Sequence, residues 1–400
     1  MKVAILNSYK KINVRLRNEI ESLQSSGHIV NVFLLDRGNN REVSFENEEL
    51  TAHVYKIGLN FPLKAASFLC YLPIVYMCLF KTLLNHEYDV LHICHPVFLP
   101  LALIIGKIKK CKILYDCFEL HSVSFFYRLP KRIRLKPLIK LGEYLEEKMV
   151  CCVDGVITID TADDYLIKRY KKANQKVVAL YNVPDLNVEP DDDLLEELKR
   201  KYWNRKIVSC IGGISRAKCI KEMVEAANIL RDIFPEIKFF FIGTIRDDCE
   251  DEIIKYITLH KLETNIQFTG WESYKRMLSY LAISDAGLAL YRPLPHYLLS
   301  RGNARRIFTY MSLSVPVIAS KFGEIGKIVY ETDCGLIVDP ADAREIAEAL
   351  KYLLENPEKA RAMGANGRKA IEEEFNWERE QDKLLRVYDQ LSRVYNYLGP

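Results

Sequence analysis

The residues whose types and spacing most clearly suggest a binding site lie near the middle of the chain, where a lysine follows a pair of glycines. An apolar run at 207–211 ends at Gly212 and Gly213, and apolar residues at helical spacing begin at position 220. Glycines let a backbone approach an anion closely, and a helix N-terminus offers free N–H groups and partial positive charge. Lys218, expected in the first helical turn, would meet a phosphate there. A glycine pair also fits an ordinary chain reversal, and that alternative stays open.

A second cationic segment follows at 301–306. It holds Arg301, Arg305 and Arg306 together with Asn303, and it precedes an apolar stretch at 307–313. In a doubly wound sheet this segment lies beside the carboxyl ends of the strands, where anionic ligands bind. A surface-exposed helix start is the alternative interpretation.

Other chemistry-bearing residues have simpler explanations. No group of His, Cys and acidic residues has the spacing of metal ligands, so we expect no metal site. Asp339, Pro340 and Asp342 predict a helix start with an aspartate cap, a proline at the first position and an acid in the first turn. His92 ends an apolar run and is expected to be a core histidine with satisfied hydrogen bonds.

The elements that must position these residues alternate regularly along the chain. Short apolar runs predict strands, and between several of them amphipathic stretches such as 14–23 and 138–150 predict helices. In the first half the strands are expected at 3–6, 29–35, 90–93, 112–115, 155–159 and 177–180, and in the second half at 207–211, 238–242, 266–268, 286–290, 315–319 and 335–338.

Strand and helix alternation of this kind favours an α/β fold with two Rossmann-like, doubly wound parallel sheets. The length of 400 residues also predicts two domains. We expect an N-terminal domain at 1–183, a linker at 184–203 that is rich in prolines and acids, a second domain at 204–376, and a C-terminal helix at 377–400 that crosses back to the first domain. The cleft between the domains is the expected ligand site.

Charge differs between the halves. Residues 1–183 hold 26 Lys and Arg against 18 Asp and Glu, whereas the rest holds 31 against 35. The excess concentrates in Arg128, Lys131, Arg132, Arg134, Lys136 and Lys140, which could meet an anionic membrane surface or a phosphorylated acceptor; a solvated helix face is the alternative. The uncharged run at 65–80 is too short to span a bilayer and contains Pro73, so we expect a buried or interfacial helix.

The eleven cysteines include no CxxC pair, and the N-terminus lacks the apolar core of a secretory signal. These features favour a cytoplasmic protein, peripheral at the inner face of the membrane if the basic segment binds lipid.

Motifs spread over nearly the whole chain resemble the retaining GT-B glycosyltransferases of family 4, among them the sugar transferases of surface-polysaccharide assembly. The first half carries RLRNE at 15–19, DVLH at 89–92, YDCFE at 115–119 and YNVP at 181–184. The second half carries IGGI at 211–214, FFIG at 240–243, FTGW at 268–271, FTYM at 308–311, VPVI at 315–318 and CGLIVDP at 334–340. The order and spacing of these motifs carry the resemblance.

The resemblance implies a nucleotide-sugar bound in the second domain and an acceptor in the first, without a metal or a cofactor. Gly212, Gly213 and Lys218 then form the diphosphate site, and Arg306 takes the position of the family's second basic donor contact. Gly270, beside Phe268 and Trp271, lies near the nucleobase, and Asn303 joins the donor-binding residues. Cations suit a metal-free reaction because they neutralise the charge that develops on the leaving diphosphate.

Three positions depart from the family pattern. The acid that usually holds the donor ribose falls at Thr309, and a hydroxyl cannot hold two ribose hydroxyls as a carboxylate can. The first-domain histidine falls at Phe118, although Glu119 follows it. An acid common after the first-domain strand falls at His95. Glu119 and His95 are therefore the catalytic candidates; a helix-start or salt-bridged carboxylate and a hydrogen-bonded structural histidine are the alternatives.

We therefore expect transfer of a sugar from a nucleoside diphosphate to a carbohydrate acceptor, lipid-linked, with retention of configuration and with no nucleic-acid partner. A catalytically silent homologue that binds a nucleotide-sugar or a partner transferase is the first alternative, supported by Thr309 and Phe118. A sugar-nucleotide epimerase is the second alternative, and it would need further acids and histidines.

Overall fold

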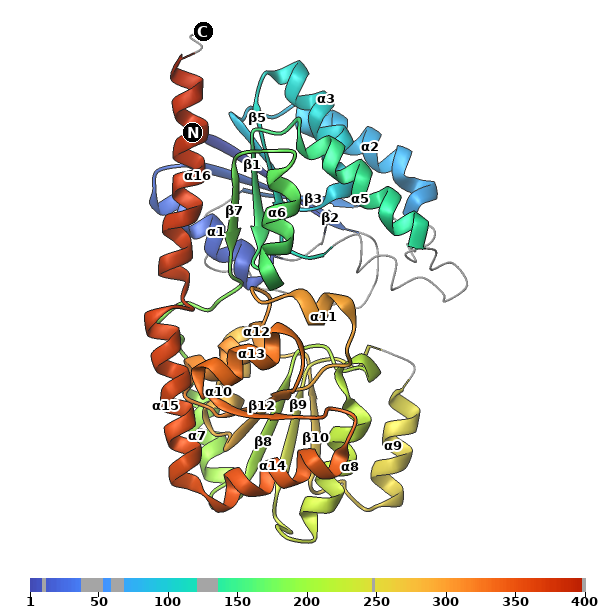
Figure 1. The fold of residues 1–400 in the computed structure, drawn as a ribbon, viewed down its shortest axis with the longest axis vertical. Coiled ribbons are helices and arrows are strands. Elements are labelled where there is room, and N and C mark those ends of the chain that lie inside the picture. Colours follow the sequence, from blue (N-terminus) through green and yellow to red (C-terminus); the bar gives the residue numbers. More distant parts are fainter. Residues whose placement is uncertain (9–11, 37–52, 59–67, 121–135, 247–248, 398–400) are drawn as a thin grey trace. The chain divides into compact units, whose positions relative to one another are not determined.

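The chain folds into two compact units. The computed structural model describes residues 1–8, 12–36, 53–58, 68–120, 136–246 and 249–397. The first unit comprises Met1–Asn182 together with Arg379–Pro400, and the second comprises Val183–Glu378. Figure 1 shows the fold of the chain, with each parallel sheet accompanied by helices.

The first unit is built on a seven-stranded parallel sheet with strand order β3-β2-β1-β4-β5-β6-β7. Its strands are β1 (Lys2–Asn7), β2 (Ile29–Asp36), β3 (His53–Gly58), β4 (Val90–Ile93), β5 (Lys112–Cys117), β6 (Gly155–Ile159) and β7 (Val177–Leu180). Its helices are α1 (Val14–Ser25), α2 (Phe68–Leu84), α3 (Leu99–Lys109), α5 (Lys136–Val150), α6 (Tyr165–Lys171) and the greater part of α16 (Trp377–Tyr397).

The second unit has a six-stranded parallel sheet with order β10-β9-β8-β11-β12-β13. Its strands are β8 (Ile207–Ile211), β9 (Lys238–Ile242), β10 (Ile266–Gly270), β11 (Ala286–Ala289), β12 (Val317–Ser320) and β13 (Gly335–Val338). Its helices are α7 (Asp192–Lys201), α8 (Ile220–Arg231), α9 (Glu250–Leu259), α10 (Tyr274–Ala282), α11 (Pro295–Leu299), α12 (Arg305–Ser312), α13 (Gly323–Thr332), α14 (Ala343–Glu355) and α15 (Pro357–Glu373).

The interior strands are buried throughout and mostly apolar because both of their faces are covered. Every residue of β4, β6, β8 and β9 is buried, as expected for a parallel sheet between two layers of helices. In the second unit, apolar side chains of α8, α9 and α14 close one core with strands β8 and β9. The predicted fold class, two doubly wound parallel-sheet units, is confirmed.

Each sheet has a point at which the strand order reverses, between β1 and β4 in the first unit and between β8 and β11 in the second. In doubly wound folds, ligands bind outside the carboxyl ends of the strands at such a point. The glycine pair follows β8 directly, and the loop after β4 carries His95.

Some local expectations need correction. Residues 184–203, expected as a linker, contain α7, which begins at a capping Asp191 whose side chain accepts from the Leu194 N–H. Strand β3 was not predicted. The helix expected to start at Asp339 starts at Ala343, because the Asp342 side chain caps it by accepting from the N–H groups of Arg344 and Glu345. Asp339 forms an ion pair with Lys321 instead, at 3.1 Å.

The apolar run at 65–80 contributes to α2, which contains Pro73 and has both buried and exposed apolar residues. None of the helices in the described ranges combines the length and the apolar character needed to cross a bilayer.

Candidate functional site

The glycine pair after β8 forms a tight junction with the neighbouring strand β9. Gly212 has φ +82° and donates its N–H to the carbonyl of Ile242 at 2.8 Å. A Cβ on Gly243 would lie 2.2 Å from the carbonyl oxygen of Gly212, so the two backbones approach too closely for a side chain there. The loops after β8 and β9 continue side by side, because Ile214 donates to Thr244 at 3.0 Å and Arg246 donates back to Ile214 at 2.9 Å.

Lys218 lies in a short 3₁₀ turn, Arg216–Lys218, which precedes α8. The sequence placed it in the first turn of that helix; instead Cys219, in the left-handed region at φ 58°, separates the turn from the helix. Burial and the nearby guanidinium groups of Arg306 and Arg246 hold the pKa of Lys218 well below its ordinary value. Within the described ranges Lys218 forms no ion pair, so no carboxylate relieves this unfavourable environment.

Arg306, the second residue of α12, is buried and points back to the glycine pair. Its Nη2 donates to the carbonyl of Gly213 at 3.0 Å, and its guanidinium carbon lies 5.3 Å from the centre of the Tyr291 ring. Like Lys218, it forms no ion pair with a carboxylate in the part of the chain that the structure describes. The structure therefore brings Gly212, Gly213, Lys218 and Arg306 together.

Arg246 belongs to the same cluster, and the sequence analysis missed it. A Cβ on Gly213 would lie 2.6 Å from Nε of Arg246 and 2.8 Å from its Cδ, so the arginine side chain lies over this glycine. The sequence signal that could have identified Arg246 is its position after a strand next to β8. Arg246 follows β9, the neighbour of β8, and loops after adjacent parallel strands meet at the same edge of a sheet.

Other predicted residues have identified partners. The Thr309 hydroxyl donates to the carbonyl of Arg305 at 2.8 Å, one turn earlier in α12. Asn303 accepts from Nε of Arg305 at 3.1 Å. Gly270, at φ +77°, pairs with Gly243 in an isolated bridge, and a Cβ on it would meet no atom within 4 Å.

Arg301 has a different role from Arg306. It forms ion pairs with Glu331 at 2.7 Å and with Glu324 at 3.5 Å, so its charge is already balanced. The cationic segment at 301–306 thus divides into a paired arginine and one that is buried without a carboxylate.

In the first unit, a buried ionic network joins α1 to the sheet. The guanidinium of Arg15 donates to Glu19 at 2.7 Å, to Asp116 at 2.8 Å and to the side chain of Asn182 at 2.9 Å. All four residues are buried. Burial and the neighbouring Asp116 raise the pKa of Glu19, opposed by Arg15.

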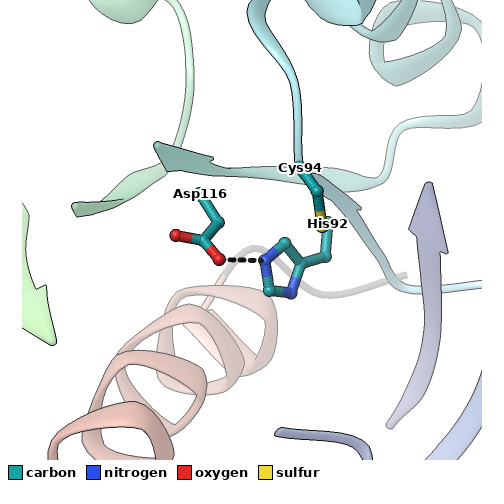
Figure 2. Close-up of side chains that lie close together, drawn as sticks. All are labelled: His92, Cys94 and Asp116. Carbon is teal, nitrogen blue, oxygen red and sulfur yellow. Dashed lines mark ion pairs between the residues drawn. The ribbon is translucent and has the colours of Figure 1, made fainter. Parts of the chain in front are cut away.

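Asp116 of this network also forms, with His92 and Cys94, a group that resembles a metal-ligand set (Figure 2). The ligand atoms of His92, Cys94 and Asp116 all lie within 4.8 Å of one another, from neighbouring strands β4 and β5 and the residue after β4. Linear spacing gave no sign of this group. Burial, with Asp116 and Glu19 nearby, raises the pKa of the Cys94 thiol well above its usual range, and the Arg15 guanidinium already neutralises Asp116. We therefore interpret the trio as part of the ionic network.

His92 is less completely satisfied than the sequence suggested. Its Nδ1 lies 2.8 Å from the Tyr388 hydroxyl of α16. Its Nε2 is buried without a hydrogen bond among the described residues, 3.8 Å from Asp116. The histidine thus connects α16 to the charged network of the sheet.

The catalytic candidates of the first unit lie after β4 and β5. The Nδ1 of His95 accepts from the Val97 N–H at 3.2 Å and caps a 3₁₀ turn, the structural role named as its alternative. Phe118 is buried, and the Glu119 side chain is half-buried, with no ion pair in the described residues. Glu119 therefore keeps its capacity to bind a ligand.

The predicted basic segment is only partly described. Arg128, Lys131, Arg132 and Arg134 lie outside the described residues, and for Lys136 only the backbone, at the start of α5, is described. Within α5 a continuous stripe is exposed. It repeats every three or four residues and consists of Pro137, Lys140, Leu141, Tyr144, Leu145 and Lys148. The stripe combines apolar side chains with two lysines.

Comparisons with known proteins agree with this architecture. Residues 193–370 match the family Glycosyl transferases group 1. The chain is 25% identical to spore coat protein SA of Bacillus subtilis over 60% of this chain and 66% of that protein. It is 24% identical to N-acetyl-alpha-D-glucosaminyl L-malate synthase of Bacillus anthracis over 56% of each chain. The matches thus span less than two thirds of the length of these relatives.

Solved structures match over nearly the whole chain. Sucrose-phosphate synthase of Thermosynechococcus elongatus aligns with a TM-score of 0.74 at 18% identity, covering 98% of this chain and 99% of that one. HepE of Anabaena, solved in complex with UDP-glucose, aligns with a TM-score of 0.69 at 15% identity, covering 98% and 100%. At these identities the likeness establishes the fold, which is the predicted GT-B class.

Proposed function

We propose that the chain is a glycosyltransferase using a nucleoside-diphosphate sugar, in line with the match of residues 193–370 to the Glycosyl transferases group 1 family. The observation that carries the proposal is the cationic cluster at the glycine turn. Lys218, Arg246 and Arg306 converge there at the switch point of the second sheet, and none of them forms an ion pair in the described ranges. Such a cluster is stabilised by an anion, and a diphosphate supplies one.

The cluster suits the chemistry of sugar transfer. The bond between the sugar C1 and the phosphate oxygen breaks, and its electron pair stays on the diphosphate. The acceptor hydroxyl oxygen bonds to C1, and its proton passes to the released diphosphate oxygen and from there to water. Fixed cations stabilise the charge that develops on the leaving group, so the proposal needs no metal. Following the family resemblance, we propose retention of configuration and assign Glu119 and His95 to the side of the reacting sugar.

The proposal is tested by assaying the purified chain with UDP-, GDP- and ADP-sugars for release or transfer of the sugar. UDP-glucose is the first choice because HepE was solved with it. Wild type should turn over one donor class in the presence of EDTA, and Lys218→Ala should not. Binding without release or transfer on any acceptor would favour the catalytically silent alternative. A strict Mg²⁺ or Mn²⁺ requirement would count against the cationic mechanism.

Thr309 offers a second test of the donor site. Because a carboxylate gives two strong acceptors to ribose hydroxyls, Thr309→Glu should tighten donor binding and maintain or raise turnover. Thr309→Val is the control, since it keeps the volume of the side chain without adding an acceptor. Weaker donor binding in Thr309→Glu than in wild type would place the ribose elsewhere.

For the acceptor we propose a lipid-linked carbohydrate at an anionic membrane surface. The support is the exposed stripe on α5, in which Leu141, Tyr144 and Leu145 lie between Lys140 and Lys148. An amphipathic helix of this kind inserts apolar side chains at the lipid interface while lysines attract anionic headgroups.

Vesicle sedimentation tests the membrane proposal. The protein should bind phosphatidylglycerol vesicles, lose binding as salt increases, and bind less after Leu141→Ser combined with Leu145→Ser. Ile254→Ser, at an exposed apolar position on α9, is a matched control. Equal binding to neutral vesicles would contradict the electrostatic part.

A further inference from the structure

We infer that Arg246 is a third cationic contact to the diphosphate, and that it binds the released nucleoside diphosphate more strongly than the intact nucleotide-sugar. The inference rests on the proposed function and adds to it a residue that neither the sequence motifs nor the family match singles out. It also assigns a role to Gly213, which leaves room for the arginine.

The position of Arg246 is fixed by the backbone. Strands β8 and β9 are paired from Ile207 to Ile211, and the pairing continues beyond them through a bridge between Ile214 and Ile245. The Arg246 N–H donates to Ile214 at 2.9 Å. Its side chain therefore starts beside the glycine turn and lies over Gly213, where a Cβ would come within 2.6 Å of Nε.

Three different elements thus supply cations to one turn. Lys218 comes from the 3₁₀ turn after β8, Arg246 from the loop after β9, and Arg306 from α12. Arg306 and Arg246 both lie close enough to Lys218 to disfavour its protonated form. Arg246 is exposed, whereas Arg306 is buried, so Arg246 can meet a phosphate directly from the solvent side.

The negative charge of the ligand determines whether the three cations bind the nucleotide-sugar or the released diphosphate more strongly. In a nucleotide-sugar each phosphate has one ester bond and one anhydride bond and carries a single negative charge. When the bond between C1 and the phosphate oxygen breaks, the electron pair remains on the terminal phosphate, which keeps only its anhydride bond and, like other singly substituted phosphates, has a second pKa of about 6. The released diphosphate is therefore more negative at neutral pH, and each cation gains more from it than from the donor.

Isothermal titration calorimetry tests this inference. The probes are UDP, UDP-glucose and inorganic pyrophosphate, with the GDP and ADP pairs used if wild type binds them more tightly. Arg246→Ala should weaken diphosphate binding by about tenfold, in the range of a hydrogen bond to a charged group, and should weaken nucleotide-sugar binding less. Arg246→Lys should recover part of the loss.

Gly213→Ala tests whether the absence of a side chain at Gly213 is what lets Arg246 lie over the glycine turn. Gly213 is not among the positive-φ glycines, so alanine fits its backbone, but the added Cβ must displace the Arg246 side chain. Gly213→Ala should weaken diphosphate binding in wild type and cause little further loss in Arg246→Ala. This non-additivity is the signature of two residues acting through one contact.

The matched control is Arg216→Ala. Arg216 lies in the same 3₁₀ turn as Lys218 but forms an ion pair with Glu252 at 2.8 Å, so its removal should leave diphosphate affinity nearly unchanged.

A loss of diphosphate affinity in Lys218→Ala without a loss in Arg246→Ala would overturn the inference and keep the proposed function. Equal losses for diphosphate and nucleotide-sugar would overturn the preference. Absence of nucleotide binding by wild type would overturn both the function and the inference.

Discussion

Arg15 in the first unit and Arg306 in the second occupy equivalent local positions. Each is buried and is the second residue of its helix, α1 and α12 respectively, where the helix dipole disfavours a cation. Arg15 is balanced by Glu19 and Asp116. Arg306 has a carbonyl, a thiol and an aromatic ring around it, and its charged neighbour is Lys218.

The difference separates a cation that is neutralised within the protein from a cation that we propose binds an external anion. A buried cation that has its counter-charges within the protein stabilises the fold only as long as the pairs stay complete. A buried cation without a carboxylate in the described ranges keeps its electrostatic attraction for an external anion. Burial and charge alone do not distinguish these roles; the partners do.

The largest effect should follow from breaking the paired side of this comparison. Arg15→Met leaves Glu19 and Asp116 buried without their cation, and should reduce the free energy of unfolding by about 3 to 5 kcal/mol. Urea denaturation measures the change. The control is Arg17→Ala, which removes an exposed pair with Glu21 and should cost less than about 1 kcal/mol. Similar losses in the two variants would show that the network is not a structural unit.

The next largest effect concerns ligand affinity in the second unit. Lys218→Ala or Arg306→Ala should weaken nucleotide binding by about 1.5 to 3 kcal/mol, because each loses a charged hydrogen bond to the diphosphate. Arg301→Ala should have little effect, since its charge is balanced by Glu324 and Glu331. Unchanged affinity in both of the first two variants would reject the assignment of the site.

A smaller effect is the pH dependence of ligand affinity, which should distinguish Lys218 from a cation that is already paired. The pKa of Lys218 is depressed in the free protein by burial and by neighbouring cations, and a bound diphosphate should raise it. Binding above the depressed pKa should therefore take up a proton, and affinity should fall as pH rises, by at most about tenfold per pH unit. Calorimetry in buffers of different ionisation enthalpy measures the uptake. Lys218→Met should abolish this proton linkage.

The smallest effect should have the opposite sign to that of Arg15→Met. Removing the Lys218 charge from its unfavourable environment should raise the melting temperature of the ligand-free protein by a few degrees, at about 2 to 4 °C per kcal/mol for a domain of this size. A depressed lysine pKa costs stability below the ordinary lysine pKa, so the difference between Lys218→Met and wild type should shrink as pH rises towards that value. A lower melting temperature at neutral pH would indicate that Lys218 has a stabilising partner.

Much of the fold could be predicted because buried parallel strands are nearly continuous apolar runs. The expected bounds of β4, β6, β7, β8, β9 and β13 agree with the structure. Strand β3 was missed because it is an edge strand: His53 and Lys56 are exposed, so the apolar run that identifies a central strand is absent.

The candidate site could be predicted from the sequence only where its residues lie close together along the chain. Gly212, Gly213 and Lys218 follow one strand and could be grouped by sequence, and the family resemblance added Arg306. Arg246 comes from the next strand, and the His92 and Asp116 contact comes from the pairing of β4 with β5. Both depend on which strands become neighbours, a property that periodicity along the chain does not contain.

The last helix also sets the order in which the protein can be completed during synthesis. Residues 379–400 belong to the first unit, where the Tyr388 hydroxyl meets His92, and where a Cβ on Gly155 would contact Val387 and Leu391. The first unit thus lacks this part of its core until residues 379–400 have been synthesised. The second unit, formed by Val183–Glu378, is fully translated earlier. During synthesis, the second unit can therefore complete its fold before the first unit does.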